Sequence, residues 1–578
     1  MRTSLLLRAS SLVAVPVLSL ASQQPAASPS PSSRRVVACM GQQIEQVTIY
    51  TEAPSVASLR RVPIVARVAR TMHETTQPDV VERFLLFEAG DRCEELRRAE
   101  SERILRAQPF IADADVFIVS NDDGTVDVEV RTIDETAVVL GGSVRARSPN
   151  VSGLLFGNAN LGGQGVYVSG AWRAGDGFRD AYIGRLIDNQ FLGRALVAGI
   201  EGERNTIGGS WRLNAGRPFL TDLQRVAWRG RTGESFGLLE LRREDGTRPK
   251  VAMRRRFYEL GVLGRVGVPG RLGLFGISIT GDDEEPGNRL VAADSGRIRD
   301  IGPLPRAYLP HHIARVNVLL GVRDIRFVRR RALDAITASQ DVPLGVQIGL
   351  QAGRSSPIVG AKEEDIFLAG DLYAGRSRSE RATTRLQLRT EGRRAAGEAA
   401  WDGVLATGQL SHQVKVNTAN LDELALEWAG GYQQRMPFQL LLGVPEGGVR
   451  GYEKSSYAGG QRLVVRAEHR YSYGAVRNLG DLAVGGFIDA GRQWAGDVPF
   501  GVTTPVKASI GLSLFASVPP RSARVWRADL AFPVSRGARA GWTLRFSNLD
   551  RTAFTFRDAR DVAAGRELTV PSSIFAWP

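Results

Sequence analysis

The sequence predicts a mainly β fold: a C-terminal transmembrane antiparallel β-barrel preceded by one small α+β domain. Three observations predict it. The chain opens with an export signal, no later stretch reaches the roughly eighteen uninterrupted apolar residues of a membrane-spanning helix, and most of the remainder alternates apolar and polar residues. An exported chain with this alternation is typical of a barrel that crosses the outer membrane with strands.

The export signal lies in the first residues. Arg2 and Arg8 supply positive charge, the stretch from Leu5 to Leu20 is apolar, and Ser19-Leu20-Ala21 is a small-x-small cleavage pattern. These features predict a signal peptide over 1–21. The apolar run is short for a bilayer span, which disfavours the alternative of an uncleaved anchor.

Composition narrows the function classes. At 578 residues the chain is too long for one ordinary domain. Its net charge of +14 comes mainly from arginines spread along alternating segments, without a recognised nucleic-acid-binding motif, so nucleic acid is not expected as a partner. Mean hydropathy is −0.14, as suits strands with one polar face. Only 2 cysteines are present, which excludes a disulfide-dense scaffold.

Motifs for catalysis and metal binding are absent from the sequence. It contains no G-x-S-x-G elbow, no H-E-x-x-H and no P-loop, so no catalytic residue, metal site or cofactor is expected. The five histidines are scattered, and the adjacent pair His311-His312 would point to opposite faces of a strand. The acidic run 282–285 could attract a divalent cation, but an extracellular loop is the better interpretation.

A linker and a small domain follow the signal. Residues 22–41 begin rich in Ser, Pro, Ala and Gln, which predicts a flexible linker. Residues 42–136 read as strand, helix, helix, strand, strand. Thr76 is a candidate cap for the first helix, Pro109 ends the second, and 121–124 (Asn-Asp-Asp-Gly) is typical of a hairpin turn.

The chain has two cysteines: Cys39 lies just before this small domain, and Cys93 lies at the start of its second predicted helix. In an oxidising compartment they could form a disulfide that ties the entry of the domain to its second helix. Two free thiols are an equally weighted alternative.

The barrel is expected over 150–578. Runs such as Leu424, Leu426 and Trp428 place apolar side chains on one face of a strand. In other strands, polar side chains such as Glu468 and Arg545 lie on the opposite face from the apolar ones. The strands of a soluble β-sandwich also alternate between apolar and polar residues. Hundreds of residues with Arg and Glu on the polar face favour a water-filled lumen instead.

Two short motifs stand about forty residues apart in the C-terminal half. The first is 447–452, Gly-Gly-Val-Arg-Gly-Tyr, and the second is 486–491, Gly-Phe-Ile-Asp-Ala-Gly. Glycines permit tight turns and close backbone approach, and an arginine fork can be accepted by a carboxylate at two points. The alternative interpretation is an ordinary surface hairpin with an exposed arginine.

With the small domain in front, these motifs resemble the BamA/TamA/FhaC superfamily of outer-membrane barrels, and the domain resembles a POTRA module. Gln108-Pro109-Phe110 departs from the usual glycine–aromatic pair of that module. The resemblance implies about sixteen strands. It also implies a long extracellular loop folded into the lumen, whose tip (Val449, Arg450, Gly451, Tyr452) is held by Arg450 pairing with Asp489 of the wall strand that carries Phe487, Asp489 and Gly491.

Three other stretches also resemble strands of the superfamily, with less specific motifs. The run that contains Asn160, Leu161, Gly162 and Gly165 is similar to the first barrel strand of the superfamily, at the seam. Residues 527–533 are similar to the penultimate strand, and 542–548 would then be the last. Alternatively, the tail after 548 contains the closing strand.

The resemblance implies a non-enzymatic assembly or translocation factor that inserts or exports polypeptides. The implied partners are unfolded outer-membrane or secreted polypeptides, outer-membrane lipid or lipopolysaccharide, and periplasmic chaperones or assembly partners. The expected location is the bacterial outer membrane, with the POTRA-like domain in the periplasm. Two alternatives stay open: a two-partner secretion transporter for a cognate exoprotein, and a passive pore or surface antigen.

Overall fold

The computed structural model describes most of the chain after the predicted signal. The described residues are 35–54, 74–144, 151–174, 180–205, 207–294, 297–444, 447–452, 455–476, 480–534, 541–550 and 558–566. The predicted signal peptide and most of the predicted linker lie outside them. Among the described helices, none combines the length and the apolar character needed to cross a membrane.

A small N-terminal domain precedes the barrel. Its elements are β1 (Ile44–Glu52), α2 (Pro78–Glu82), α3 (Glu95–Arg106), β2 (Ile111–Ser120) and β3 (Val126–Asp134). This is the order that the sequence predicts. The sheet order is β1-β3-β2, with β1 parallel and β2 antiparallel to β3. Thr76 does not cap α2, because the residue before the helix is Gln77 and the Thr76 hydroxyl bonds to Asp134 instead.

The core of the domain lies between its helices and its sheet. Buried side chains of α2 and α3, such as Val80 and Leu105, pack against Val128 and Val130 of the central strand β3. Cys39 and Cys93 form a disulfide, as one of the two alternatives expected.

The segment before the disulfide is held by the sheet. Val36 bridges Val119, and the Val37 N–H donates to Ile118 O at 2.9 Å. Residues 35–37 therefore extend the sheet beyond β2. The flexible linker expected over 22–41 does not include them, because their backbone groups are paired.

The remaining long strands form one closed barrel in which consecutive strands pair antiparallel. The first part of the wall contains β4 (Val138–Val144), β5 (Val151–Leu161), β6 (Val166–Arg173), β7 (Ala181–Asp188), β8 (Val197–Asn205), β9 (Gly208–Arg217), β10 (Val226–Glu240), β11 (Lys250–Val268) and β12 (Arg271–Asp294). The second part contains β14 (His311–Arg331), β15 (Ser339–Ser355), β16 (Asp365–Ser379), β17 (Ala382–Ala395), β18 (Asp402–Lys415), β19 (Asn420–Tyr432), β24 (Gln461–Val476), β25 (Gly480–Trp494), β26 (Lys507–Ser517), β27 (Arg524–Pro533) and β28 (Thr543–Asp550). β13 (Arg297–Pro303) pairs with the far end of β12.

This order corrects two details of the sequence analysis. The barrel begins at Val138 rather than near 150, and β4 joins β28 to close the ring. The described wall also holds more strands than the sixteen expected, because β4 to β9 span only 7 to 11 residues each. Shorter strands allow the same length of chain to form a larger number of strands. The closing strand β28 is the one predicted as last.

The two faces of the wall differ in polarity. On β19, Leu424, Leu426 and Trp428 are exposed on the outside, while Glu427 between them is buried. The same alternation places Ile488 outside and Asp489 inside on β25. An apolar outer face with a polar, ion-paired interior is the pattern of a barrel surrounded by lipid.

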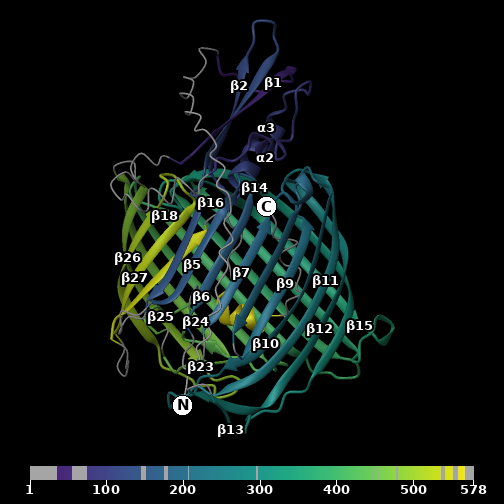
Figure 1. Ribbon diagram of the computed structural model, residues 1–578, viewed down its shortest axis with the longest axis vertical. Coiled ribbons are helices and arrows are strands. Elements are labelled where there is room, and N and C mark those ends of the chain that lie inside the picture. Colours follow the sequence, from purple (N-terminus) through teal and green to yellow (C-terminus); the bar gives the residue numbers. More distant parts are fainter. Residues whose placement is uncertain are drawn as a thin grey trace, which may run out of the picture.

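The N-terminal domain covers one mouth of the barrel. In Figure 1, α2 and α3 lie between the domain's sheet and the end of the barrel wall. At the opposite end, the chain between β19 and β24 (433–460) turns inward. A short helix beyond the last strand, α4 (Arg560–Gly565), also contacts inner-wall residues. These inward-facing segments position the candidate site.

Candidate functional site in the barrel lumen

The long loop 433–460 enters the barrel from the end away from the N-terminal domain. Two short pairings shape it: β20 (Leu440–Leu441) with β23 (Ala458–Gly459), and β21 (Gly443–Val444) with β22 (Gly447–Gly448). The predicted tip follows β22 directly. Arg450 is only 4% exposed. The tip therefore lies on the inner side of the wall.

Arg450 and Asp489 are joined by three hydrogen bonds. The Arg450 Nε donates to Asp489 Oδ2 at 2.7 Å, and Nη2 donates to Oδ1 at 2.6 Å. The Arg450 backbone N–H also donates to Oδ2 at 3.1 Å. Both oxygens of the carboxylate are thus used, and the guanidinium lies 3.5 Å from the centre of the Phe487 ring. A bidentate, stacked arginine is a geometry that lysine cannot reproduce.

The pair belongs to a larger charge network that the motifs alone did not reveal. Arg450 Nη1 donates to Glu468 Oε2 at 2.9 Å, and Arg527 Nη2 donates to the same oxygen at 2.5 Å. Arg527 and Arg545 both bind Asp529, at 2.6 and 3.0 Å. Strands β24, β25, β27 and β28 therefore contribute carboxylates and arginines around the loop tip. The available signal was the period-two placement of Glu468, Arg527, Asp529 and Arg545, but only the register shows that they meet.

Apolar contacts and backbone geometry complete the tip. Val449 and Tyr452 are buried together with Leu442 and Val464. Gly448 and Gly451 have φ of +64° and +90°, which side chains rarely adopt, so glycine is needed at both bends. The tip is held by charge, packing and turn geometry at once.

The other mouth is crossed by the turn 332–338 between β14 and β15. Asp334 accepts from Arg385 Nη1 and Nη2 at 2.8 Å each, and Arg470 donates to the carbonyls of Asp334 and Ala335 at 3.2 Å. Ile336 is buried in an apolar cluster. The cluster also contains two residues of the turn and one each from β25, β26 and β27 (Ala335, Ala338, Ala483, Phe515, Val525). The turn thus reaches from β14 to β27 across the inside of the barrel.

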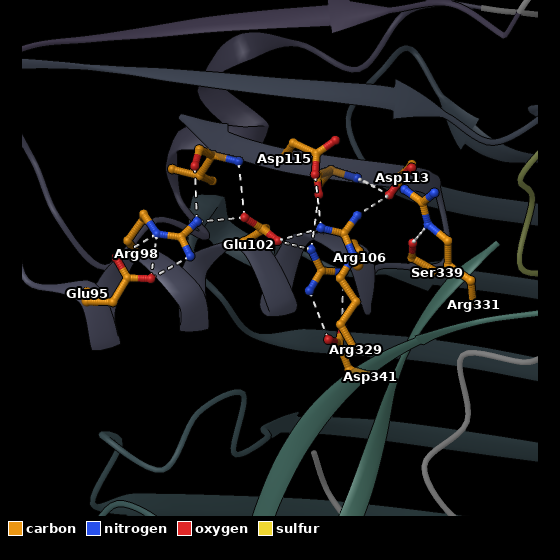
Figure 2. Close-up of polar contacts among 12 residues, drawn as sticks. Glu95, Arg98, Glu102, Arg106, Asp113, Asp115, Arg329, Arg331, Ser339 and Asp341 are labelled. Atoms are coloured by element: carbon orange, nitrogen blue, oxygen red, sulfur yellow. Dashed lines mark hydrogen bonds and ion pairs between the residues drawn. The ribbon is translucent and has the colours of Figure 1, made fainter. Parts of the chain in front are cut away.

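Helix α3 of the N-terminal domain forms ion pairs with both strands that flank this turn, β14 and β15. Figure 2 shows Arg106 paired with Asp341 of β15 and Arg329 of β14 among acidic residues of the domain. Arg106 donates to Asp341 at 2.9 and 3.0 Å, while Arg329 lies 3.1 Å from both Glu102 and Asp115. These contacts join the N-terminal domain to the base of the turn.

The side chains that form this contact, Glu102 and Arg106, stabilise each other in their charged forms. Burial raises the pKa of Glu102, but the cations Arg106 and Arg98 outweigh it and hold that pKa below its ordinary value. Burial also acts to lower the pKa of Arg106, and Asp341 with Glu102 overcomes it, so the pKa of Arg106 rises. Both partners remain ionised at neutral pH.

The predicted first-strand residues lie elsewhere than expected. Asn160 and Leu161 end β5, the second strand of the wall, and Gly162 and Gly165 belong to the turn after it. That turn contacts the N-terminal domain: Asn160 Nδ2 donates to Thr76 Oγ1 at 2.8 Å. This run is therefore not at the seam. Its glycines form a tight turn at the domain junction, and the strand before it, 138–144, begins the barrel.

Asp134 completes this junction from within the domain. Thr76 donates its backbone N–H and its hydroxyl to the carboxylate, both at 2.7 Å. Burial raises the pKa of Asp134 to about 6, against those two hydrogen bonds. A chain of contacts Asp134–Thr76–Asn160 thus joins the domain to the barrel and contains a group that titrates near neutral pH.

The lumen side chains described above are mainly arginines and carboxylates. Within the described ranges, no group of three or more His, Cys, Asp or Glu residues could hold a metal ion. The buried charges are paired with one another across the wall, the loop and the turn.

Comparisons with known proteins give the following results. No family model matches the chain, and no curated protein matches it. Among solved structures it is similar to BamA from Haemophilus ducreyi lacking POTRA domains 1–3, with 13% identity, a TM-score of 0.37, and coverage of 88% of this chain and 85% of that one. It is also similar to CdiB from Escherichia coli, with 12% identity, a TM-score of 0.41, and coverage of 88% and 76%. Likenesses of this degree do not assign the chain to a family.

Proposed function

We propose that this chain is a bacterial outer-membrane barrel that inserts or exports unfolded polypeptides. The observation that carries the proposal is the inward loop 433–460, whose tip is fixed to the wall by Arg450 and Asp489. A loop that only lay on the surface would not need a buried, bidentate ion pair. A loop that closes the lumen and later rearranges needs a contact of this kind to hold it in the closed position.

The two covered mouths support this function over a passive pore. One end contains the loop, and the other contains the turn 332–338, whose flanking strands contact the N-terminal domain. A passive pore conducts through an open path, whereas a polypeptide carrier must stay closed between clients. The domain that grips the turn through Arg106 and Arg329 is placed to receive a client, or a chaperone that delivers it, from the periplasm.

Reconstitution tests the proposal. Vesicles containing the full chain are mixed with a urea-unfolded outer-membrane protein, and its folding is followed by gel mobility and protease protection. The expected result is faster folding or transfer than in empty vesicles, and slower with Arg450→Ala. If the vesicles pass small solutes steadily and never speed a polypeptide client, the chain is a passive pore.

A further inference from the structure

The segment 558–566, beyond the last strand, lies inside the barrel against the inner wall. Ala559, just before helix α4, and Val562 within the helix are buried in an apolar cluster made by the wall and by the inward loop. The other members of that cluster are Leu405 and Ala429 of the wall and Phe438, Leu440 and Val444 of the loop. The segment therefore contacts the inner wall and the inward loop at the same time.

Charged side chains hold the segment at its centre. Asp561 accepts from Arg462 Nη1 at 2.5 Å and from the Leu441 backbone N–H at 2.8 Å. Arg462 is fully buried, and its Nη2 donates to Glu427 at 2.7 Å, so the wall supplies an arginine already positioned for a second carboxylate. One aspartate thus contacts both the wall and the loop.

The end of the segment is held as well. Arg566 donates to Glu391 and to Thr407 Oγ1, each at 3.0 Å, and to Asp558 at 2.9 Å. Asp558 in turn lies 3.4 Å from Arg389 of the wall. Glu391 is 2% exposed. Wall residues therefore form ion pairs with both the acidic and the basic side chains at these positions: Arg389 with Asp558, Arg462 with Asp561, and Glu391 with Arg566.

The fit is also steric. A Cβ at Gly565 would lie 2.4 Å from the Phe438 ring, and a Cβ at Gly447 would lie 2.5 Å from the Ala559 Cβ. Small residues are thus needed on both sides of the contact. Beside the segment a cavity of about 610 Å³ remains, lined by several arginines of the wall and loop.

We infer that the inner wall and the inward loop form a peptide-binding site, and that its occupant is the chain's own C-terminal segment. The site selects a short helix with an aspartate for Arg462, small apolar residues for the Phe438 cluster, and an arginine for Glu391. Occupation narrows the lumen and braces the loop independently of Arg450. The inference does not depend on which client the barrel carries, or on whether it carries one.

Thiol labelling in the full chain tests the site without removing anything. Val562→Cys is buried in the site, whereas Ala563→Cys, its neighbour on the exposed side of α4, is the matched control. We expect Val562→Cys to react far more slowly with a water-soluble maleimide than the control. Adding Asp561→Ala should speed the Val562→Cys reaction at least about tenfold, because it removes the hydrogen bonds that Asp561 accepts from Arg462 and from the Leu441 N–H, and leave the control unchanged. Equal rates at 562 and 563 would overturn the inference.

A second measurement uses the peptide itself. A chain ending at residue 557 is expected to show higher single-channel conductance than the full chain. A synthetic peptide of residues 558–566 should bring the conductance back down, and the same peptide with Asp561→Arg should not. Unchanged conductance after truncation, or equal block by both peptides, would overturn the inference. These readouts need no polypeptide client, so their failure is distinguishable from failure of the proposed function.

Discussion

Gly491 of β25 and Val449 of the loop tip are in direct contact, with no room for a side chain at position 491. A Cβ there would lie 2.5 Å from Val449 Cγ2, and the Leu463 carbonyl oxygen would be 3.1 Å away. The glycine two residues after Asp489 is therefore part of the loop site. It lets the tip approach closely enough for Arg450 to reach both carboxylate oxygens.

Replacing this glycine should displace the tip. Gly491→Ala is expected to lower the free energy of unfolding by about 1–3 kcal/mol, the usual cost of overpacking a filled site. Gly486→Ala on the same strand is the control, because the nearest atom to its Cβ is 4.0 Å away. Urea denaturation in lipid vesicles measures both variants. Equal effects at 486 and 491 would show that the tip does not pack on β25.

Shortening the arginine fork should weaken the loop site without removing its charge. Arg450→Lys keeps one cation but cannot bind both Asp489 oxygens and Glu468 together, so we expect a loss of about 1–3 kcal/mol. Arg492→Lys, on an exposed position of β25, should cost little. Tryptophan fluorescence during denaturation gives the comparison. A lysine variant as stable as the native chain would contradict the bidentate role.

The N-terminal domain should gain stability in mild acid through Asp134. Its pKa is raised to about 6 in the folded chain, so the folded state binds the proton more tightly than the unfolded state does. The resulting stabilisation is complete below the ordinary aspartate pKa and is lost as pH rises through about 6. It amounts to at most about 3 kcal/mol.

Hydrogen exchange of the 126–134 segment, corrected for intrinsic rates, measures this effect at pH 5 and pH 7.5. Protection should be greater at pH 5 in the native chain. In Asp134→Asn, which cannot titrate, the difference should be much smaller, with the remainder coming from Asp113, whose pKa burial also raises. A difference of the same size in that variant would assign the pH dependence to another group.

Reversing one charge should loosen the domain from the barrel. Arg329→Glu places a carboxylate beside Glu102 and Asp115 (Figure 2), which converts attraction into repulsion. Because these side chains are partly exposed, each pair contributes about 1 kcal/mol or less, and the effect should be a shift in population. Chemical crosslinking between domain and barrel should fall, whereas Arg326→Glu, exposed on the same strand, should leave it unchanged.

The sequence predicted the barrel and its polar interior well, because period-two alternation is a local property of each strand. It also indicated the Arg450–Asp489 pair through two motifs and their resemblance to a superfamily. The partners Glu468 and Asp529 could not be predicted, since they meet the tip only through the register of β24, β25 and β27. Strand register depends on pairing along the whole wall.

Two other features lay beyond a single sequence for different reasons. The glycine-rich run after Asn160 was interpreted as the first strand at the seam, but its contact with Thr76 depends on where the domain docks. Helix α4 is too short to show a helical period, and its few apolar residues are small. Its position is set by buried charges from distant strands.

A double-cysteine crosslink tests the central claim most directly, namely that the loop tip lies inside the barrel against β25. Val449→Cys and Gly491→Cys would bring two thiols within disulfide range only if the tip is folded inward. In intact outer membranes, mass spectrometry should find the 449–491 disulfide as the main product, formed without added oxidant. If the thiol introduced at position 449 instead reacts fully with a membrane-impermeant maleimide from outside the cell and no such disulfide is found, the loop is a surface loop and the account is contradicted.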